Sequence, residues 1–160
     1  MRLDHRTLQH GYTLAEVLIV IAIIGILAAV AMPRLSRIRD QSQLAGATTR
    51  FTRAVMAARQ ASIQRGKRAY FKHRGDSVWV TLDTTGNNTD SVIVTSALSL
   101  NALYGVQVTS PSGLITIEYD PRGIATQAAK QTFLFKHTGS GRLDSLCISK
   151  LGNTIREMCP

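Results

Sequence analysis

The chain has 160 residues, of which 44% are hydrophobic and 18% charged, and its formal net charge is +9. This length fits one modest domain with an appended segment and excludes a multi-domain enzyme, while the composition excludes an intrinsically disordered chain. A strongly basic chain commonly has nucleic acid or an anionic membrane as its partner.

The basic charge is concentrated in one part of the chain. Residues 34–74 hold eleven Lys and Arg against one Asp, whereas residues 75–160 hold six against seven acidic residues. The second half is therefore almost neutral, and the high net charge points to local basic patches rather than to a basic domain.

The first predicted element is a membrane-spanning helix over residues 14–32. Residues 17–32 read VLIVIAIIGILAAVAM and contain no polar side chain. At 1.5 Å per residue, residues 14–32 extend about 28 Å, close to the thickness of a hydrocarbon core. The run is too long for a signal-peptide core and lacks a small-x-small cleavage site before Pro33. A chain of this length also could not bury a helix that is apolar on every face.

Glu16 is the exception within this apolar stretch. A carboxylate at membrane depth costs about 2.5–3.5 kcal/mol, so it is expected to be functional and to have a cationic partner. An α-amino group would supply that cation if the chain were cut before Tyr12.

The residues around this position resemble a known processing signal. Residues 11–17, GYTLAEV, are similar to the class III signal of type IV prepilins, G-F-T-L-x-E, with Tyr12 in place of the common Phe. The resemblance implies that prepilin peptidase removes the leader, residues 1–11, by cutting after Gly11 and methylates Tyr12. It also implies that Glu16 compensates the N-terminal amine of a neighbouring subunit during filament assembly.

The helix is expected to continue beyond the membrane, so that one long helix occupies residues 12–66. Pro33 would kink this helix rather than end it. Gly66 is a plausible C-cap, preceded by the dipole-compensating Arg65. Beyond Pro33, apolar and small residues recur every three or four positions and form a stripe that can pack on a domain: Leu44, Ala47, Phe51, Val55, Ala58 and Ser62.

Residues 67–160 are expected to form a β-rich domain, because the hydrophobic period changes to two after Gly66. The first two strands flank a turn that contains Gly75 and Asp76 and predict a hairpin. Gly and Pro punctuate the remaining segments. The predicted strands are 69–73, 78–82, 92–95, 106–109, 114–119, 132–136, 143–149 and 154–158.

Further segments resemble the FimT/GspH family of minor pilins and H-type pseudopilins. Residues 58–66 are similar to its A-R-x-x-A-I-x-R-G stretch, residues 117–123 to its I-x-F-x-P-x-G turn, and residues 148–153 to the start of its closing strand pair. The resemblance implies an α+β type IV pilin fold, with a long N-terminal helix packed on a small antiparallel sheet.

The function implied by this family is a FimT-like minor pilin of a type IV pilus, involved in assembly and DNA uptake in natural transformation. An H-type pseudopilin of a type II secretion system is the alternative. The implied partners are prepilin peptidase, other pilin subunits and the inner membrane, with a single pass and the C-terminal domain in the periplasm.

The two cysteines, Cys147 and Cys159, are expected to form a disulfide. A three-residue loop over residues 152–154 would place them directly opposite each other on paired strands, within bonding range. The bond would contribute roughly 3 kcal/mol and would persist in an oxidising periplasm. Two separate buried thiols are the alternative, and a zinc site lacks two further ligands.

Residues near the C-terminus form a candidate DNA site. Some FimT-type proteins contact DNA through a basic G-R-x-R motif, and residues 152–156, GNTIR, occupy the corresponding stretch. Asn153 replaces the first Arg, and Arg156 lies one position later than the second. Arg142, Lys150 and Arg156 could engage the phosphates of double-stranded DNA. Ordinary solvated surface cations are the alternative, and the altered motif slightly favours it.

No enzymatic motif accompanies these features. The histidines show no ligand spacing, and G-x-S-x-G, Walker and H-E-x-x-H motifs are absent from the sequence. The expectation is a structural protein without cofactor or metal, which is itself the substrate of prepilin peptidase.

Overall fold

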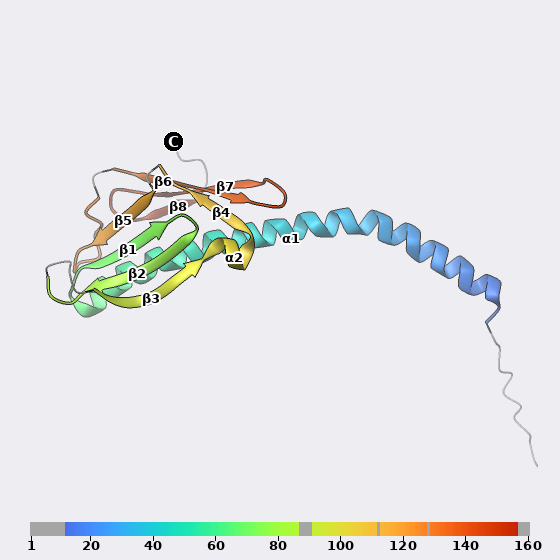
Figure 1. Cartoon of the computed structure of the whole chain (residues 1–160), viewed down its shortest axis with the longest axis horizontal. Helices are drawn as coiled ribbons and strands as arrows, with labels where there is room; N and C mark the ends of the chain where they lie inside the picture. Colours follow the sequence, from blue (N-terminus) through green and yellow to red (C-terminus); the bar gives the residue numbers. More distant parts are fainter. Residues whose placement is uncertain (1–11, 87–90, 112, 128, 157–160) are drawn as a thin grey trace, which may run out of the picture. The chain divides into compact units, whose positions relative to one another are not determined.

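The computed structural model describes residues 12–86, 91–111, 113–127 and 129–156. The chain divides into two compact units, residues 1–38 and 39–160. The long helix α1 (Leu14–Arg65) begins in the first unit, and the remaining described elements belong to the second (Figure 1). They are β1 (Ala69–Arg74), β2 (Ser77–Asp83), β3 (Ser91–Ser99), α2 (Leu100–Tyr104), β4 (Val106–Thr109), β5 (Leu114–Tyr119), β6 (Gln131–His137), β7 (Leu143–Ile148) and β8 (Thr154–Arg156).

The first unit contains the apolar part of α1. Thr13 caps the helix, because its side-chain oxygen accepts a hydrogen bond from the Glu16 amide at 3.2 Å. By length and composition α1 can cross a membrane, and none of its apolar window is buried against the described residues.

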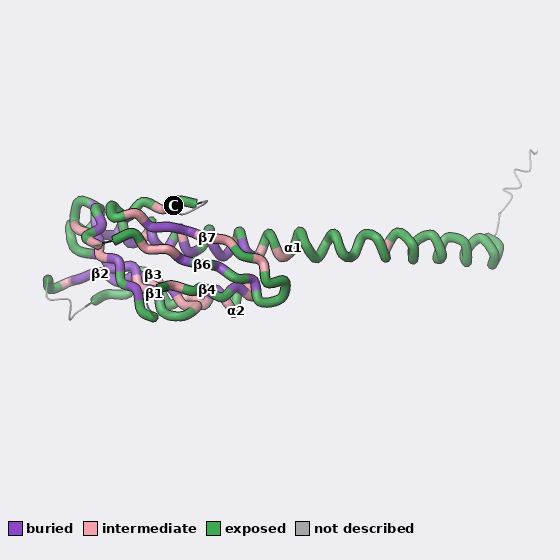
Figure 2. Tube along the Cα trace, turned by 90° about the horizontal axis from the view of Figure 1, so that it is seen from above, coloured by how far each residue is buried: buried purple, intermediate pink, exposed green. Residues whose placement is uncertain are grey.

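Within the second unit, α1 buries the predicted stripe. Leu44, Phe51 and Val55 are buried, as are Ala47, Ala58 and Ser62 of the same stripe, and Figure 2 shows this change from the exposed first part of the helix. The helix ends at Arg65, and Gly66 adopts the left-handed conformation expected of a C-cap.

Two four-stranded sheets complete the second unit (Figure 1), with strand orders β3-β2-β1-β5 and β4-β6-β7-β8. Neighbouring strands are antiparallel in both sheets. The predicted hairpin around Gly75 is confirmed, with Arg74 paired to Ser77. The expected α+β architecture, with a long N-terminal helix packed on antiparallel strands, is therefore confirmed, although the sheet is divided into two.

Phe51 of α1 joins the two sheets in a common core. Its ring centroid lies 5.1 Å from that of Phe71 on β1, and 4.7 Å and 5.2 Å from those of Phe133 and Phe135 on β6. Two of these pairs are edge-to-face, an arrangement that aromatic rings prefer, and the pair with Phe133 is tilted. One helix residue thus holds both sheets against α1.

The helix α2 was not predicted, because five residues are too few to show a helical period. Ser99 caps it through a hydrogen bond from the Ala102 amide, and Gly105 ends it in the left-handed conformation. The Tyr104 ring packs against Gly46 of α1, where an added Cβ would lie 2.8 Å from Tyr104 Cε1. Gly46 thus allows the close approach of α2 to α1.

Asp76 connects the two sheets at the β1–β2 turn. Its carboxylate accepts a hydrogen bond from the Val108 amide of β4 at 3.0 Å, and its carbonyl accepts one from the Leu100 amide at 2.8 Å. A carboxylate that accepts a backbone N–H across 32 residues orders the chain between β2 and β4.

The pairing of β7 with β8 differs from the predicted register. Cys147 lies opposite Ile155, and the connection spans residues 149–153 rather than a three-residue loop. The prediction that Cys147 lies directly opposite Cys159 is therefore wrong. The longer turn is held by the Ser149 amide, which donates to the Asn153 carbonyl at 2.9 Å, and by the Gly152 amide, which donates to the Ser149 carbonyl.

Candidate functional site

The predicted processing and assembly residues lie at the start of α1. Gly11 lies outside the described residues, and Tyr12 is 84% exposed next to it. Glu16 is exposed in the first turn of the helix, where a carboxylate also compensates the helix dipole. Tyr12 lies just before the helix and Glu16 lies in its first turn. Both line a shallow hollow together with Val17, Val20 and Ile21.

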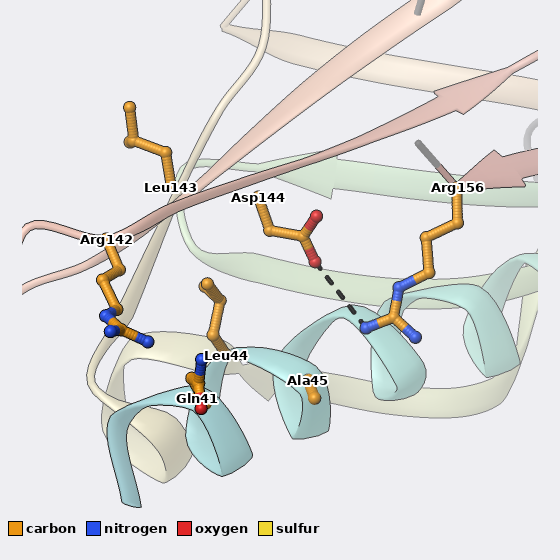
Figure 3. Close-up of a pocket in the computed structure, with 7 residues that line it drawn as sticks. All are labelled: Gln41, Leu44, Ala45, Arg142, Leu143, Asp144 and Arg156. Carbon is orange, nitrogen blue, oxygen red and sulfur yellow. Dashed lines mark ion pairs between the residues drawn. The ribbon is translucent and has the colours of Figure 1, made fainter. Parts of the chain in front are cut away.

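Arg156 of β8 reaches across to α1. Its Nη2 atom donates to Thr48 Oγ1 at 2.7 Å and lies 3.6 Å from Asp144 Oδ2 of β7 (Figure 3). Thr48 is buried, whereas the Arg156 side chain is half-exposed. Two protein partners therefore already engage the guanidinium group that was expected to contact DNA.

Arg142 and Arg156 both line a groove with a volume of about 360 Å³. Figure 3 shows Arg142 and Asp144 directed towards α1 and Leu143 directed away from it, as the alternation of a strand requires. The other lining residues are Gln41, Leu44 and Ala45. Two arginines and one carboxylate thus face a groove with an apolar floor.

The other two predicted DNA residues lie in the β7–β8 turn. Lys150 is exposed, whereas the Asn153 side-chain oxygen accepts a hydrogen bond from Arg59 Nη1 of α1 at 3.0 Å. The structure therefore does not gather the four residues into one basic patch. It places Arg142 and Arg156 along one groove and leaves Lys150 on the turn.

Cys147 is buried in β7 and is not a free thiol. Its predicted partner Cys159 lies outside the described residues, so the pairing stays a prediction.

Sequence reasoning missed the partners of Arg156 and Asn153, which are Asp144 and Thr48 for the first and Arg59 for the second. Asp144 follows Arg142 by two positions on a strand, and this alternation places both on one face, so it could have been recognised. Thr48 and Arg59 gave no such signal, because each lies about 100 residues from its partner.

Two parts of the chain match known protein families. Residues 6–32 match the prokaryotic N-terminal methylation motif. Residues 47–152 match the family described as type II transport protein GspH. The first match covers the predicted processing signal, and the second covers most of the unit that contains the sheets.

Similar proteins occur in Neisseria. A fimbrial protein of Neisseria meningitidis serogroup B is 34% identical over 112 residues, which are 70% of this chain and 56% of that protein. A type IV major pilin protein PilE1 of Neisseria gonorrhoeae is 28% identical over 142 residues, which are 88% of this chain and 58% of the relative. The chain thus spans little more than half the length of these relatives.

A solved structure shares the fold. The crystal structure of the type IV minor pilin FimU of Pseudomonas aeruginosa has a TM-score of 0.57, with 12% identity, and the match covers 76% of this chain and 92% of that one.

Proposed function

The chain belongs to the GspH family and carries the N-terminal methylation motif, and on that premise we propose that it is a minor pilin subunit of a type IV pilus. The observation that carries this proposal is the apolar helix with one carboxylate, Glu16, placed one turn after Tyr12 and followed by a unit of pilin fold. An H-type pseudopilin of a type II secretion system is the alternative within the same family.

Processing supplies the first step of the proposed function. Prepilin peptidase would cut after Gly11 on the cytoplasmic side of the inner membrane and methylate Tyr12, with residues 39–160 in the periplasm. Mass spectrometry of the mature chain is expected to show methylated Tyr12 as its first residue. A chain that keeps residues 1–11 in cells with active peptidase would contradict the proposal.

Glu16 would then pair with the N-terminal amine of a neighbouring subunit, because an unpaired carboxylate at membrane depth is costly. We expect Glu16→Gln to be processed normally but to be lost from sheared filaments. Thr13→Ala is the matched control, because it removes the helix cap and leaves the charge unchanged. Filament incorporation of Glu16→Gln at the wild-type level would exclude this role.

A sheared-filament assay also separates the two members of the family. A minor pilin is expected in sheared surface pili, and its deletion should reduce piliation. A pseudopilin is expected to leave piliation unchanged, and its deletion should abolish secretion of type II substrates.

Contact with double-stranded DNA is a second, narrower proposal, supported by the exposure of Lys150 in the β7–β8 turn, while Arg142 lies at the opposite end of β7. Weak phosphate contacts should weaken as salt rises. We expect Lys150→Ala to lower the affinity of the purified full chain for labelled duplex, and Arg156→Ala to change it little, because Asp144 already pairs with Arg156. Absence of binding at low salt would exclude the proposal.

A further inference from the structure

β3 is an edge strand that no other described strand pairs with on its outer side. Among the described residues it pairs only with β2, and the order β3-β2-β1-β5 places it at the edge of its sheet. Strands β1 and β2 each bury most of their inward-facing residues, whereas no residue of β3 is buried. Val92, Ile93 and Val94 are 56%, 66% and 45% exposed, so branched apolar side chains stand on both faces.

This edge lacks charged residues and proline, two of the features that normally prevent strand pairing, although the register of its pairing with β2 shifts on either side of Val80. Proteins protect open edges with charged residues, proline or a covering element. Residues 91–99, SVIVTSALS, contain no charged residue and no proline. The opposite edge strand, β5, carries Glu118, which pairs with Arg68 at 3.4 Å. The unprotected character therefore belongs to β3 and not to the sheet as a whole.

A groove of about 580 Å³ lies between β3 and the end of α1. Among the described residues its walls carry two cations, Arg65 and Lys67, and no carboxylate. Lys67 is held at the rim because its Nζ donates to the Thr84 carbonyl at 2.9 Å. The other lining residues are Ala61, Gln64, Leu82, Thr84, Val92, Ile93 and Val94. An extended segment lying along β3 would enter a basic, partly apolar groove.

We propose that β3 pairs with an extended segment of a different filament subunit, apolar at alternate residues and carrying a carboxylate that reaches Arg65. The unpaired main-chain groups of β3 provide affinity, and the groove provides selectivity for the acidic residue. Pairing of β3 with the β3 strand of a second copy fits less well, because residues 91–99 would bring no carboxylate to the groove. The inference rests on the proposed function, since it names one partner within the filament.

Site-specific photocrosslinking of the full chain in cells tests this pairing. Benzoylphenylalanine replaces Ile93, and in the control it replaces Leu114, which is 46% exposed on the opposite edge strand. We expect a crosslink at Ile93 several-fold stronger than at Leu114, mapped by mass spectrometry to an acidic, apolar segment of another pilin subunit. In the same background Arg65→Glu should reduce the yield several-fold, and Arg53→Glu, at an exposed position elsewhere on α1, should not.

Other outcomes overturn the proposal. Crosslinks that map to this chain would make β3 a self-association surface, and equal yields at Ile93 and Leu114 would show no selective partner. A crosslinking yield that is unchanged by Arg65→Glu would exclude a contact between Arg65 and an acidic residue of the partner. If the chain is present in sheared filaments and these results are negative, only the β3 inference fails. If it is absent from filaments and pseudopili, the proposed function fails with it.

Discussion

At the scale of single residues, His73 shows how burial sets chemistry. The ring lies in the core, with its centroid 5.8 Å from that of Phe51 and 5.3 Å from that of Phe133. Neither ring nitrogen has a hydrogen-bond partner within the part of the chain that the structure describes. Desolvation therefore lowers the pKa of His73 below its ordinary value of 6.5.

This burial predicts acid lability. Above pH 6.5 the imidazole is neutral in both the folded and the unfolded chain, so stability is unaffected. As the pH falls below 6.5 the unfolded chain binds a proton that the folded chain excludes, and the free energy of unfolding falls by at most about 1.4 kcal/mol per pH unit. Thermal unfolding at several pH values should show this loss in the wild type and a smaller one in His73→Phe. Parallel pH profiles for the two proteins would contradict the prediction.

Gly152 is the second residue whose role depends on tertiary contacts. Its φ is +81°, and an added Cβ would lie 2.5 Å from Tyr119 Cε1 and 2.9 Å from Ala125 Cβ. The Tyr119 hydroxyl donates to the Gly152 carbonyl at 3.0 Å, and burial raises the pKa of Tyr119 to about 12. Gly152 thus allows the turn to pack on β5.

We expect Gly152→Ala to destabilise the protein by about 2–4 kcal/mol, as backbone strain and steric overlap act together. Gly75→Ala is the control, because φ is +56° there but nothing lies within 4 Å of the added Cβ. It should lose only about 1 kcal/mol. Chemical denaturation measures both, and equal losses would show that the Tyr119 contact contributes nothing.

At the scale of elements, β8 is a short edge strand that Arg156 fastens to α1. The hydrogen bond to buried Thr48 and the half-exposed pair with Asp144 together should contribute about 1–2 kcal/mol, mostly from the hydrogen bond. We expect Arg156→Ala to lose this amount and Lys150→Ala to change stability by less than about 0.5 kcal/mol. Denaturant titration of both variants measures this difference. Coinciding unfolding midpoints would show that the contacts of Arg156 with Thr48 and Asp144 do not stabilise the fold.

The disulfide between Cys147 of β7 and Cys159, which lies outside the described residues, remains a prediction. The observed register removes the argument from directly opposed positions, but Cys147 lies opposite Ile155, which precedes Cys159 by four residues in the sequence. Alkylation and mass spectrometry of non-reduced protein should find no free thiol and one peptide that joins Cys147 to Cys159. Two alkylated cysteines would exclude the bond.

At the scale of the whole molecule, the two units differ in how far their apolar side chains are exposed. The core that holds both sheets uses α1 residues from Leu44 onwards, whereas the exposed apolar residues are concentrated in residues 12–38. We therefore expect residues 39–160 to fold without detergent and to unfold cooperatively. The full chain should need detergent. A residue 39–160 fragment that aggregates or lacks a cooperative transition would show that the first unit supports the second.

The sequence alone determined the long helix, its apolar first part, its buried stripe and the positions of the strands and turns. These features follow from periodicity and from Gly, Pro and capping residues, which act over a few neighbouring residues. The candidate processing residues could be identified from the sequence for the same reason, since Gly11, Tyr12 and Glu16 belong to one short motif.

Only the tertiary structure decided which residues from distant segments meet. The β7–β8 register, the pairing of Arg156 with Thr48 and Asp144, and the burial of His73 depend on contacts between elements, some of them about 100 residues apart in the chain. A local pattern contains no information about such contacts, because their free energy depends on how α1 and both sheets pack together. The cations that looked like one basic patch in the sequence were separated by that packing.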